Sequence, residues 1–278
     1  MIKKINISKL LSYVILIIGA VFFLLPFIWM LLTSIKPANE VMVIPLKWLP
    51  SKIEFQNYID AYNSAPFKQY YINSIIVAVC VTVGELFTTI LAAYAFANIE
   101  FKFRNILFTV LIATMMVPAE VLLIPKYVIL SELGWVNTYK ALIIPWTASI
   151  FSIFLLRQSF ITLPKDLYKA AKIDGCSDLK YLFKIMVPMS KPTIMSIVVL
   201  KVIGSWNSYM WPLIVTNTDN MRTLPVALAA FSSEAGVHYN TLMAASIMII
   251  LPIIIVYVLL QKYIIEGISN NGRNGVKG

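Results

Sequence analysis

Apolar residues in this sequence come in runs of about 20, and that run length is the strongest constraint on the fold. A helix of about 20 residues crosses the hydrocarbon core of a bilayer. The runs cover residues 10–32, 72–97, 106–124, 141–157, 193–215 and 241–263. They do not alternate apolar and polar residues as the strands of a membrane barrel do. We therefore expect an all-α membrane protein with six transmembrane helices.

The composition agrees with one transmembrane domain over residues 1–278. Apolar residues make up 59% of the chain and charged residues 13%, whereas about a quarter of a soluble domain is charged. The first run follows Lys3, Lys4 and Lys9 as a signal peptide would, but it is longer than a typical signal core and no small-x-small cleavage site follows it. We expect it to stay in place as the first transmembrane helix.

The lysines and arginines predict which loops face the cytoplasm. If the N-terminus is cytoplasmic, fifteen of them fall in inside segments and seven in outside loops, while Lys201 lies within a helix. The outside residues are Lys36, Lys47, Lys52, Lys68, Lys126, Lys140 and Arg222. Because basic residues concentrate in cytoplasmic loops, both termini are expected in the cytoplasm. The net charge of +10 then reflects topology, and it gives a nucleic-acid partner little support.

Few residues are suited to metal binding or catalysis. The two cysteines, Cys80 and Cys176, fall in a transmembrane run and in a cytoplasmic loop, and the single histidine, His238, falls in an outside loop. Neither a disulfide framework nor a metal site is implied. We expect no cofactor in this chain.

The segment at residues 35–71 combines four prolines with several aromatic residues, which predicts an outer cap of short helices and turns. Its aromatic side chains have two possible roles. They could receive an external protein, or they could lie at the level of the lipid headgroups as an aromatic belt.

Residues 164–190, between the fourth and fifth runs, predict two short helices joined at a glycine. Pro164 suits the first turn of a helix, and Gly175 suits the left-handed position after its end. Leu167, Ala170 and Ala171 share a face at helical spacing, where the alanines permit close approach of another surface. Such an elbow could anchor in lipid through its basic residues, or it could fit a groove on a partner.

At this elbow the sequence resembles the EAA loop of ABC importer permeases. The family pattern is Glu-Ala-Ala, three residues, Gly, nine residues and Ile-x-Leu-Pro. Lys169-Ala170-Ala171, Gly175 and Ile185-Met186-Val187-Pro188 stand at those spacings, with Lys169 in place of the glutamate and Val187 in place of the leucine. Several further segments resemble the second permease of the carbohydrate-uptake branch, the maltose and glycerol-phosphate type. They are Tyr71-Ile72-Asn73-Ser74, Met115-Met116-Val117-Pro118, Phe154-Leu155-Leu156-Arg157-Gln158, Trp206-Asn207, Trp211-Pro212-Leu213, Thr223-Leu224-Pro225 and Gly275-Val276-Lys277-Gly278.

The resemblance implies a permease subunit of a binding-protein-dependent importer that moves a mono- or oligosaccharide across the cytoplasmic membrane. Its implied partners are a second permease in a heterodimer, two ATPase subunits and an extracellular solute-binding protein. ATP and Mg would bind the ATPase subunits, since this chain contains no G-x-x-x-x-G-K-[ST] phosphate loop; the chain is therefore expected to be no enzyme itself. The residues implied in coupling to the ATPase are Lys169, Ala170, Ala171, Asp174, Gly175, Ile185 and Pro188.

A substrate path is expected near the fifth run, because polar groups are costly inside a transmembrane helix and tend to face a cavity or a partner. The candidates are Lys201, Trp206, Asn207 and Tyr209. An indole ring offers an apolar face to a sugar ring, and an amide bonds its hydroxyls. Helix packing and subunit contact are the alternative roles. Glu85 is interpreted as a buried hydrogen-bonding group at the permease interface.

Three other functions compete with sugar import by an ABC permease. The substrate could instead be glycerol 3-phosphate or another polar solute. An ion-coupled secondary carrier commonly shows internal repeats and helices broken near the midplane, and the sequence has no convincing repeat. A membrane-embedded enzyme needs catalytic groups at working spacing, which the apolar runs do not offer.

Overall fold

The computed structural model describes residues 7–233 and 236–273. Lys3, Lys4 and the closing segment 275–278, which entered the expectations above, lie outside these residues. The chain forms two compact units, which are described separately. One comprises Met1–Phe67 with Ala227–Pro252, and the other comprises Lys68–Val226 with Ile253–Gly278.

The regular secondary structure of the described residues is helical apart from a hairpin of two short antiparallel strands, β1 (Ser232–Ser233) and β2 (Gly236–Val237). The first unit holds α1 (Ile7–Ser34), η1 (Ala38–Glu40), α2 (Gln56–Asn63), the hairpin and the start of α13 (Tyr239–Arg273). The second unit holds α3 (Phe67–Asn98), α4 (Arg104–Thr114), α5 (Leu123–Glu132), α6 (Tyr139–Ile143), η2 (Ile144–Trp146), α7 (Ile150–Ile161), α8 (Lys165–Ile173), α9 (Asp178–Tyr181), η3 (Leu182–Met186), α10 (Val187–Met189), α11 (Lys191–Trp206) and α12 (Met210–Val215). The helical turns of η4 (Leu224–Phe231) connect the two units.

Several of these helices are long and apolar enough to cross a membrane. They lie at Leu11–Ser34, Phe67–Asn98, Tyr139–Ile161 and Tyr239–Leu259. A fifth candidate is the segment Asp178–Met189 taken together with α11, although the two parts are bent by 79°. In α1 the most apolar stretch is not buried within the chain at all, as expected of a helix that faces lipid or another subunit. The expected class, an all-helical membrane protein, is confirmed.

Three of the expected runs are interrupted by breaks. In the run 106–124, α4 ends at Thr114, and turns containing Pro118 precede α5. In the run 141–157, the helix is broken between Ile144 and Ser149, next to Pro145. In the run 193–215, α11 ends at Trp206 and α12 begins at Met210. A proline lacks an N–H and disfavours helix in the residue before it, which accounts for the first two breaks but not for the third.

The outer cap expected at residues 35–71 consists of η1, α2 and ordered turns. Asn57 of α2 is buried, and its amide donates to the carbonyls of Ser34 (2.9 Å) and Lys36 (2.8 Å), while its Oδ1 accepts from Asn240 at 2.7 Å. Glu40 accepts from the Ser51 backbone at 3.0 Å and pairs with Lys47 at 3.3 Å. The hydrogen bonds from Ser51 and then from Lys47 lower the pKa of Glu40 to about 2. The cap is thus held by side chains that satisfy its loop backbone.

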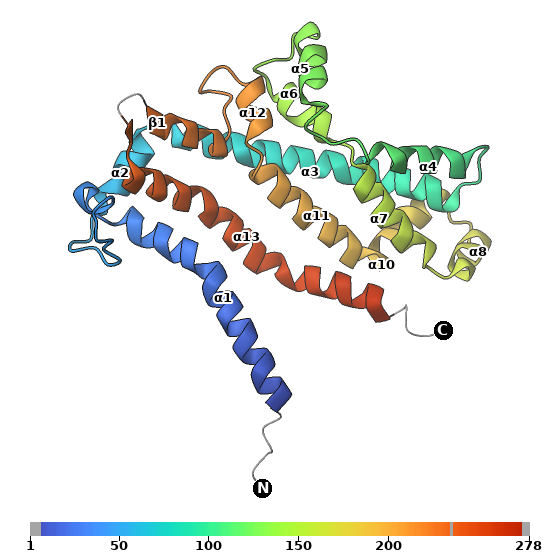
Figure 1. Cartoon of the computed structure of the whole chain (residues 1–278). Coiled ribbons are helices and arrows are strands. Elements are labelled where there is room, and N and C mark those ends of the chain that lie inside the picture. The colour runs from blue at the N-terminus through green and yellow to red at the C-terminus, as the bar shows by residue number, and fades with distance from the viewer. Residues whose placement is uncertain (1–6, 234–235, 274–278) are drawn as a thin grey trace. The chain divides into compact units, whose positions relative to one another are not determined.

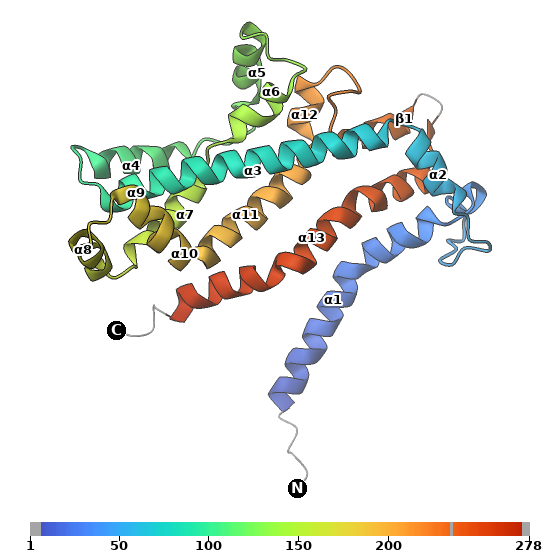
Figure 2. The same ribbon diagram turned by 180° about the vertical axis from the view of Figure 1, so that it is seen from behind.

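Figures 1 and 2 show α3 as a long helix of the second unit, and its residues take part in two apolar cores. One joins α3 to α7 and to the segment of α8 through α11, around Tyr94, Leu156 and Leu182. The other joins α3 to α5, α6 and α12, around Val81, Leu142 and Trp211. The elbow described below lies at the first core, and the cavity described below lies beside the second.

Candidate functional site

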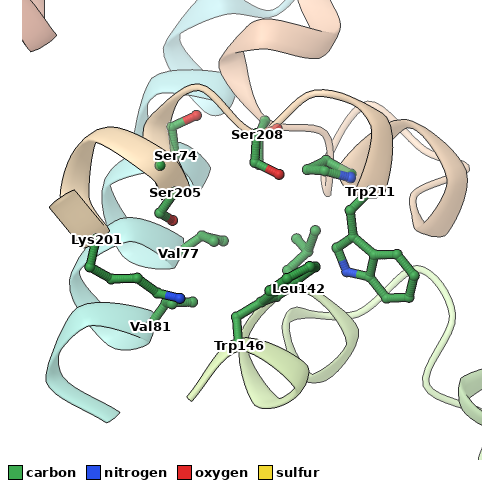
Figure 3. Close-up of a pocket in the computed structure, with 12 residues that line it drawn as sticks. Ser74, Val77, Val81, Leu142, Trp146, Lys201, Ser205, Ser208 and Trp211 are labelled. Carbon is green, nitrogen blue, oxygen red and sulfur yellow. The ribbon is translucent and has the colours of Figure 1, made fainter. Parts of the chain in front are cut away.

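A cavity of about 340 Å³ lies beside the second core (Figure 3). Its wall is contributed by α3, α6, η2, α11, α12 and the segment before η4. The lining residues are Ser74, Val77, Val81, Leu142, Trp146, Lys201, Gly204, Ser205, Ser208, Trp211, Pro212 and Thr223. This size lies within the range of ligand pockets, which are mostly apolar with a few convergent polar groups. Two of the lining residues, Trp146 and Ser208, lie at the breaks described above.

A buried ion pair links three helices at the edge of this cavity. Lys201 Nζ of α11 lies 2.5 Å from Glu85 Oε2 of α3, and the other carboxylate oxygen accepts from Ser152 Oγ of α7 at 2.6 Å. Only 3% of the Glu85 side chain and 18% of the Lys201 side chain are exposed. Glu85 is therefore buried and hydrogen-bonded, as the sequence indicated, and it also meets a charged partner inside its own chain.

Close approach of α3 to the junction of η2 and α7 makes this pairing possible. A Cβ at Gly84 would lie 2.7 Å from the Thr147 side chain, so the glycine allows the two backbones to meet. Next to it, Thr88 Oγ1 donates to the carbonyl of Thr147 at 2.6 Å. The contact places Ser152 within reach of Glu85.

Trp146 separates this cavity from a second one of about 320 Å³. Both cavities share Trp146, Ser208 and Trp211 in their walls. The two indoles meet edge to face at 6.0 Å, and Lys126 lies 4.6 Å from the Trp146 ring on the side of the second cavity. The indoles thus form the partition between two neighbouring cavities.

The four residues expected on a substrate path do not meet in one place. Lys201 lines the first cavity, where its side chain extends toward Val81 and Trp146 (Figure 3). Tyr209 lines the second cavity. Trp206 is buried, with its ring 6.4 Å from that of Tyr71, and Asn207 is exposed after the end of α11. Sequence reasoning missed Trp146 and Trp211, and the Pro145 next to Trp146 was the available signal for a break.

The elbow begins with α8, which ends as its glycine predicts. Gly175 has φ +70°, and its N–H donates to the carbonyl of Lys172 at 3.1 Å, while the N–H of Cys176 reaches the carbonyl of Ala171 at 2.9 Å. These two bonds form a Schellman motif, in which a left-handed residue satisfies the last carbonyls of the helix. Asp174, the residue between helix and glycine, is exposed.

The face of α8 that stays open differs from the expected one. Ala171 is only 7% exposed and packs in the core of its own chain, with Leu167 beside it. Among the exposed residues of α8, Asp166, Lys169, Ala170 and Ile173 recur at i, i+3, i+4 and i+7 and so share one face. Lys165 and Lys172 are also exposed. Ile173 is 86% exposed. Of the expected face of Leu167, Ala170 and Ala171, only Ala170 is therefore open, because the other two residues pack against their own chain.

Asp178 fixes α8 to the rest of the unit, a role that the sequence did not indicate. Its Oδ1 accepts from Tyr94 of α3 (3.1 Å) and from Tyr168 (3.0 Å), and it lies 2.9 Å from Lys172 Nζ. The hydrogen bond to Asp178 raises the pKa of Lys172. One carboxylate thus joins the elbow to α3.

After α9 the helix widens into the π-helical turn η3 and continues as α10. Pro188 lies within α10 and lacks an N–H, so it cannot donate a regular helical bond to the preceding turn. Ile185 packs against the elbow core, while Pro188 is exposed. Beyond Ser190 the chain turns by 79° into α11, the helix that carries Lys201.

Comparison with known proteins identifies the family. The family model described as the inner membrane component of binding-protein-dependent transport systems matches residues 85–270. The chain belongs to this family. Its match includes Glu85, the elbow and α11.

Relatives within the family are similar along nearly the whole chain. The arabinooligosaccharides transport system permease protein AraQ of Bacillus subtilis is 34% identical, with 91% of each chain covered. The sn-glycerol-3-phosphate transport system permease protein UgpE of Pectobacterium atrosepticum is 31% identical, with 94% of this chain and 95% of that protein covered.

Two solved structures share the fold. A chain of a bacterial ABC transporter involved in the import of the acidic polysaccharide alginate superimposes with a TM-score of 0.83 at 27% identity, covering 93% of this chain and 96% of that one. A chain of a bacterial alginate ABC transporter, in complex with a periplasmic protein that holds an alginate pentasaccharide, gives a TM-score of 0.67 at 15% identity, with 91% and 93% covered. This second likeness concerns the fold alone.

Proposed function

We propose that this chain is one permease subunit of a binding-protein-dependent ABC importer that carries a sugar across the cytoplasmic membrane. The observation that carries the proposal is the cavity beside α11, inside the segment that the family model matches. Its wall combines two indole rings with four hydroxyl groups. Aromatic rings and hydroxyls are the groups that contact the faces and the rim of a sugar ring.

The charge balance of the cavity favours an uncharged sugar over glycerol 3-phosphate. Lys201 is the single charged residue in the lining, and Glu85 compensates it at 2.5 Å. A phosphate ester needs cations or several N–H donors that are not already paired. Tyr209 and the exposed Asn207 would extend the path toward the second permease. The buried Trp206 would stabilise the wall of the path by packing.

Six transmembrane helices and cytoplasmic termini complete the proposed topology of a single domain, residues 1–278. The long helices and the bent pair supply five spans, and α4 with the turns after it would supply the sixth. With an inside N-terminus, the elbow at residues 164–190 lies on the cytoplasmic side and the cap lies outside, in agreement with the bias of basic residues.

This topology predicts the reactivity of single cysteines in intact cells, in a chain whose Cys80 and Cys176 are replaced by serine. Cysteines at Ser51 and Thr218 are expected to react with a membrane-impermeant maleimide, because both positions are exposed in outside loops. A cysteine at the exposed Ser177 is expected to react only after the membrane is opened. Labelling at Ser177 in sealed cells would contradict the orientation.

The proposed partners are a second permease, two ATPase subunits and an extracellular solute-binding protein, with ATP and Mg bound by the ATPase subunits. We expect the open face of α8, formed by Asp166, Lys169, Ala170 and Ile173, to dock on one ATPase subunit. A small residue beside an exposed isoleucine suits a close apolar contact with a groove. The remaining candidates for coupling would then determine the shape of the elbow rather than touch the ATPase over a broad surface. They are Asp174, Gly175, Ile185 and Pro188.

A continuous set of contacts leads from this docking face to the cavity. Asp178 ties α8 to α9 and α3, and α10 turns into α11 after Ser190. Lys201 follows ten residues after the start of α11, or about 15 Å along its axis, and pairs with Glu85 of α3. Movement of α8 would therefore shift α11 against α3 and change the width of the cavity.

Replacement of Trp146 by leucine tests the cavity as a substrate path. The variant loses a ring from both cavities, and we expect uptake of a neutral oligosaccharide to fall about tenfold, the equivalent of about 1.4 kcal/mol of lost contact. The measurement is uptake into proteoliposomes that contain the whole transporter and its binding protein. Trp146→Phe keeps an aromatic ring and should retain most of the rate.

Trp29→Leu serves as the matched control, since Trp29 lies in α1 and lines neither cavity. Glycerol 3-phosphate is tested beside the sugar. Two results would refute the assignment of the cavity to a sugar path. One is that the wild type takes up glycerol 3-phosphate in preference to every neutral sugar. The other is that sugar uptake by Trp146→Leu is unchanged in an intact complex.

A further inference from the structure

A third cavity, of about 420 Å³, lies at the opposite core of the second unit, where the end of α3, the start of α4 and the end of α7 meet α8. Its wall includes four cations, Arg104, Arg157, Lys165 and Lys169, and one carboxylate, Glu100. We propose that this cavity binds the phosphate headgroup of an anionic membrane lipid. The proposal goes beyond sugar transport and depends only on α3 and α7 being membrane-spanning helices.

Three of the four cations lack a compensating carboxylate. Within residues 7–233 and 236–273, no acidic group lies within 4.0 Å of Arg104, Arg157 or Lys165, although Lys169 has Asp166 at 3.1 Å. Unpaired charges on neighbouring residues repel each other, and a bound anion removes that repulsion. The cavity is therefore a site where an anion lowers the energy of the folded chain.

The guanidinium groups are also held in place with donors to spare. Arg157 Nε donates to the carbonyl of Phe96 at 3.0 Å, and its guanidinium carbon lies 4.1 Å from the centre of the Phe108 ring. Arg104 donates one N–H to the carbonyl of Ile99 at 3.1 Å. Each guanidinium has five N–H donors, and a phosphate can accept two of them in parallel. Oriented arginines lose little freedom when such a ligand binds.

The surroundings favour a lipid over a free phosphate. The membrane-crossing helices α3 and α7 end at Asn98 and Ile161, so the cavity lies at the level where headgroups begin. From there α4 presents exposed apolar side chains, among them Ile106 (60%) and Val110 (55%). Acyl chains can lie along this face while the headgroup occupies the basic cavity. Basic pockets between transmembrane helices on the cytoplasmic side are known to take such headgroups.

The test is the binding of phosphatidylglycerol to the purified whole transporter in phosphatidylcholine nanodiscs, followed with a fluorescent phosphatidylglycerol. We expect saturable binding for the wild type and at least a tenfold weaker affinity for Arg104→Gln. Arg104→Lys keeps the charge but not the paired donors, so an intermediate affinity is expected. Lys184→Gln is the control, because Lys184 is exposed on the same elbow and does not line the cavity. Arg104 is preferred to Arg157, whose packing on Phe108 makes its replacement a risk to folding.

Three results would overturn the proposal. They are binding that does not saturate in the assembled complex, equal loss of affinity in Lys184→Gln and Arg104→Gln, and displacement of the lipid by inorganic phosphate at equal concentration. The last result would assign the cavity to a soluble phosphate compound. Sugar uptake in phosphatidylcholine alone separates the two proposals, since the absence of a lipid site leaves the transport of sugar intact.

Discussion

Glu85→Leu is expected to lower the yield and the melting temperature of the assembled transporter more than any other single change near the cavity. The substitution leaves the Lys201 ammonium group in a site where 18% of its side chain is exposed. Removing one partner of a buried ion pair costs roughly 3–5 kcal/mol, because the remaining charge stays desolvated. Ser152 also loses the acceptor that it meets at 2.6 Å.

The double variant Glu85→Leu/Lys201→Leu distinguishes this explanation from a simple packing defect. Replacing both partners of a buried pair by apolar residues is often neutral or stabilising, so the double variant should recover most of the lost melting temperature. The measurement is the melting temperature of the purified complex for both single variants and the double one. If the two single effects simply add, Glu85 and Lys201 do not act as a pair. Ser152→Ala is expected to cost about 1 kcal/mol.

Ala170→Asp is expected to abolish coupling between ATP hydrolysis and transport while the permease still folds. Ala170 is exposed on the open face of α8, so the carboxylate is solvated in the free subunit and conflicts only with a docked partner. We expect sugar uptake to fall to the level without ATP. The ATPase subunit should either dissociate or hydrolyse ATP without stimulation by the loaded binding protein. Copurification and stimulated ATPase activity measure the two outcomes.

Ala171→Asp is the matched control, because the neighbouring residue points the other way. At 7% exposure it would place a carboxylate in the core around Tyr181 and Leu182, at a cost of several kcal/mol. This variant should lose thermal stability even without ATPase, whereas Ala170→Asp should not. A cysteine at Lys172 should cross-link to the ATPase in the wild type. Normal coupling in Ala170→Asp would remove the open face of α8 from the docking surface.

The helical periodicity of the elbow was readable from the sequence, but its orientation was not. Pro164 and Gly175 mark the two ends of α8 within two residues, since proline and glycine act through their own backbone limits. Which alanine faces outward depends on what packs against the helix. Tyr94 comes from α3, 84 residues before Asp178 in the chain, and no local pattern predicts that hydrogen bond.

For the substrate path as well, some features could be predicted from single residues of the sequence, and others depend on contacts between distant helices. Lys201 was recognisable as a costly charge inside an apolar run, and Glu85 was recognisable for the same reason. Their pairing, and the placing of Trp146 between two cavities, follow from the meeting of α3, α7 and α11. The sequence also suggested Trp206 as a ring for sugar contact, whereas the structure buries it beside Tyr71.

By itself the sequence determined the class of the protein, the ends of the elbow helix and the membrane-spanning character of its long helices. These features depend on run length, apolar content and the backbone limits of single residues, all of which are contained within one continuous stretch of the chain. Only the tertiary structure decided which charges pair, which face of α8 is open and where the cavities lie. Those features depend on which helices meet, and the apolar faces that join α3 to α7 and α11 are too similar in composition to specify their partners from the sequence.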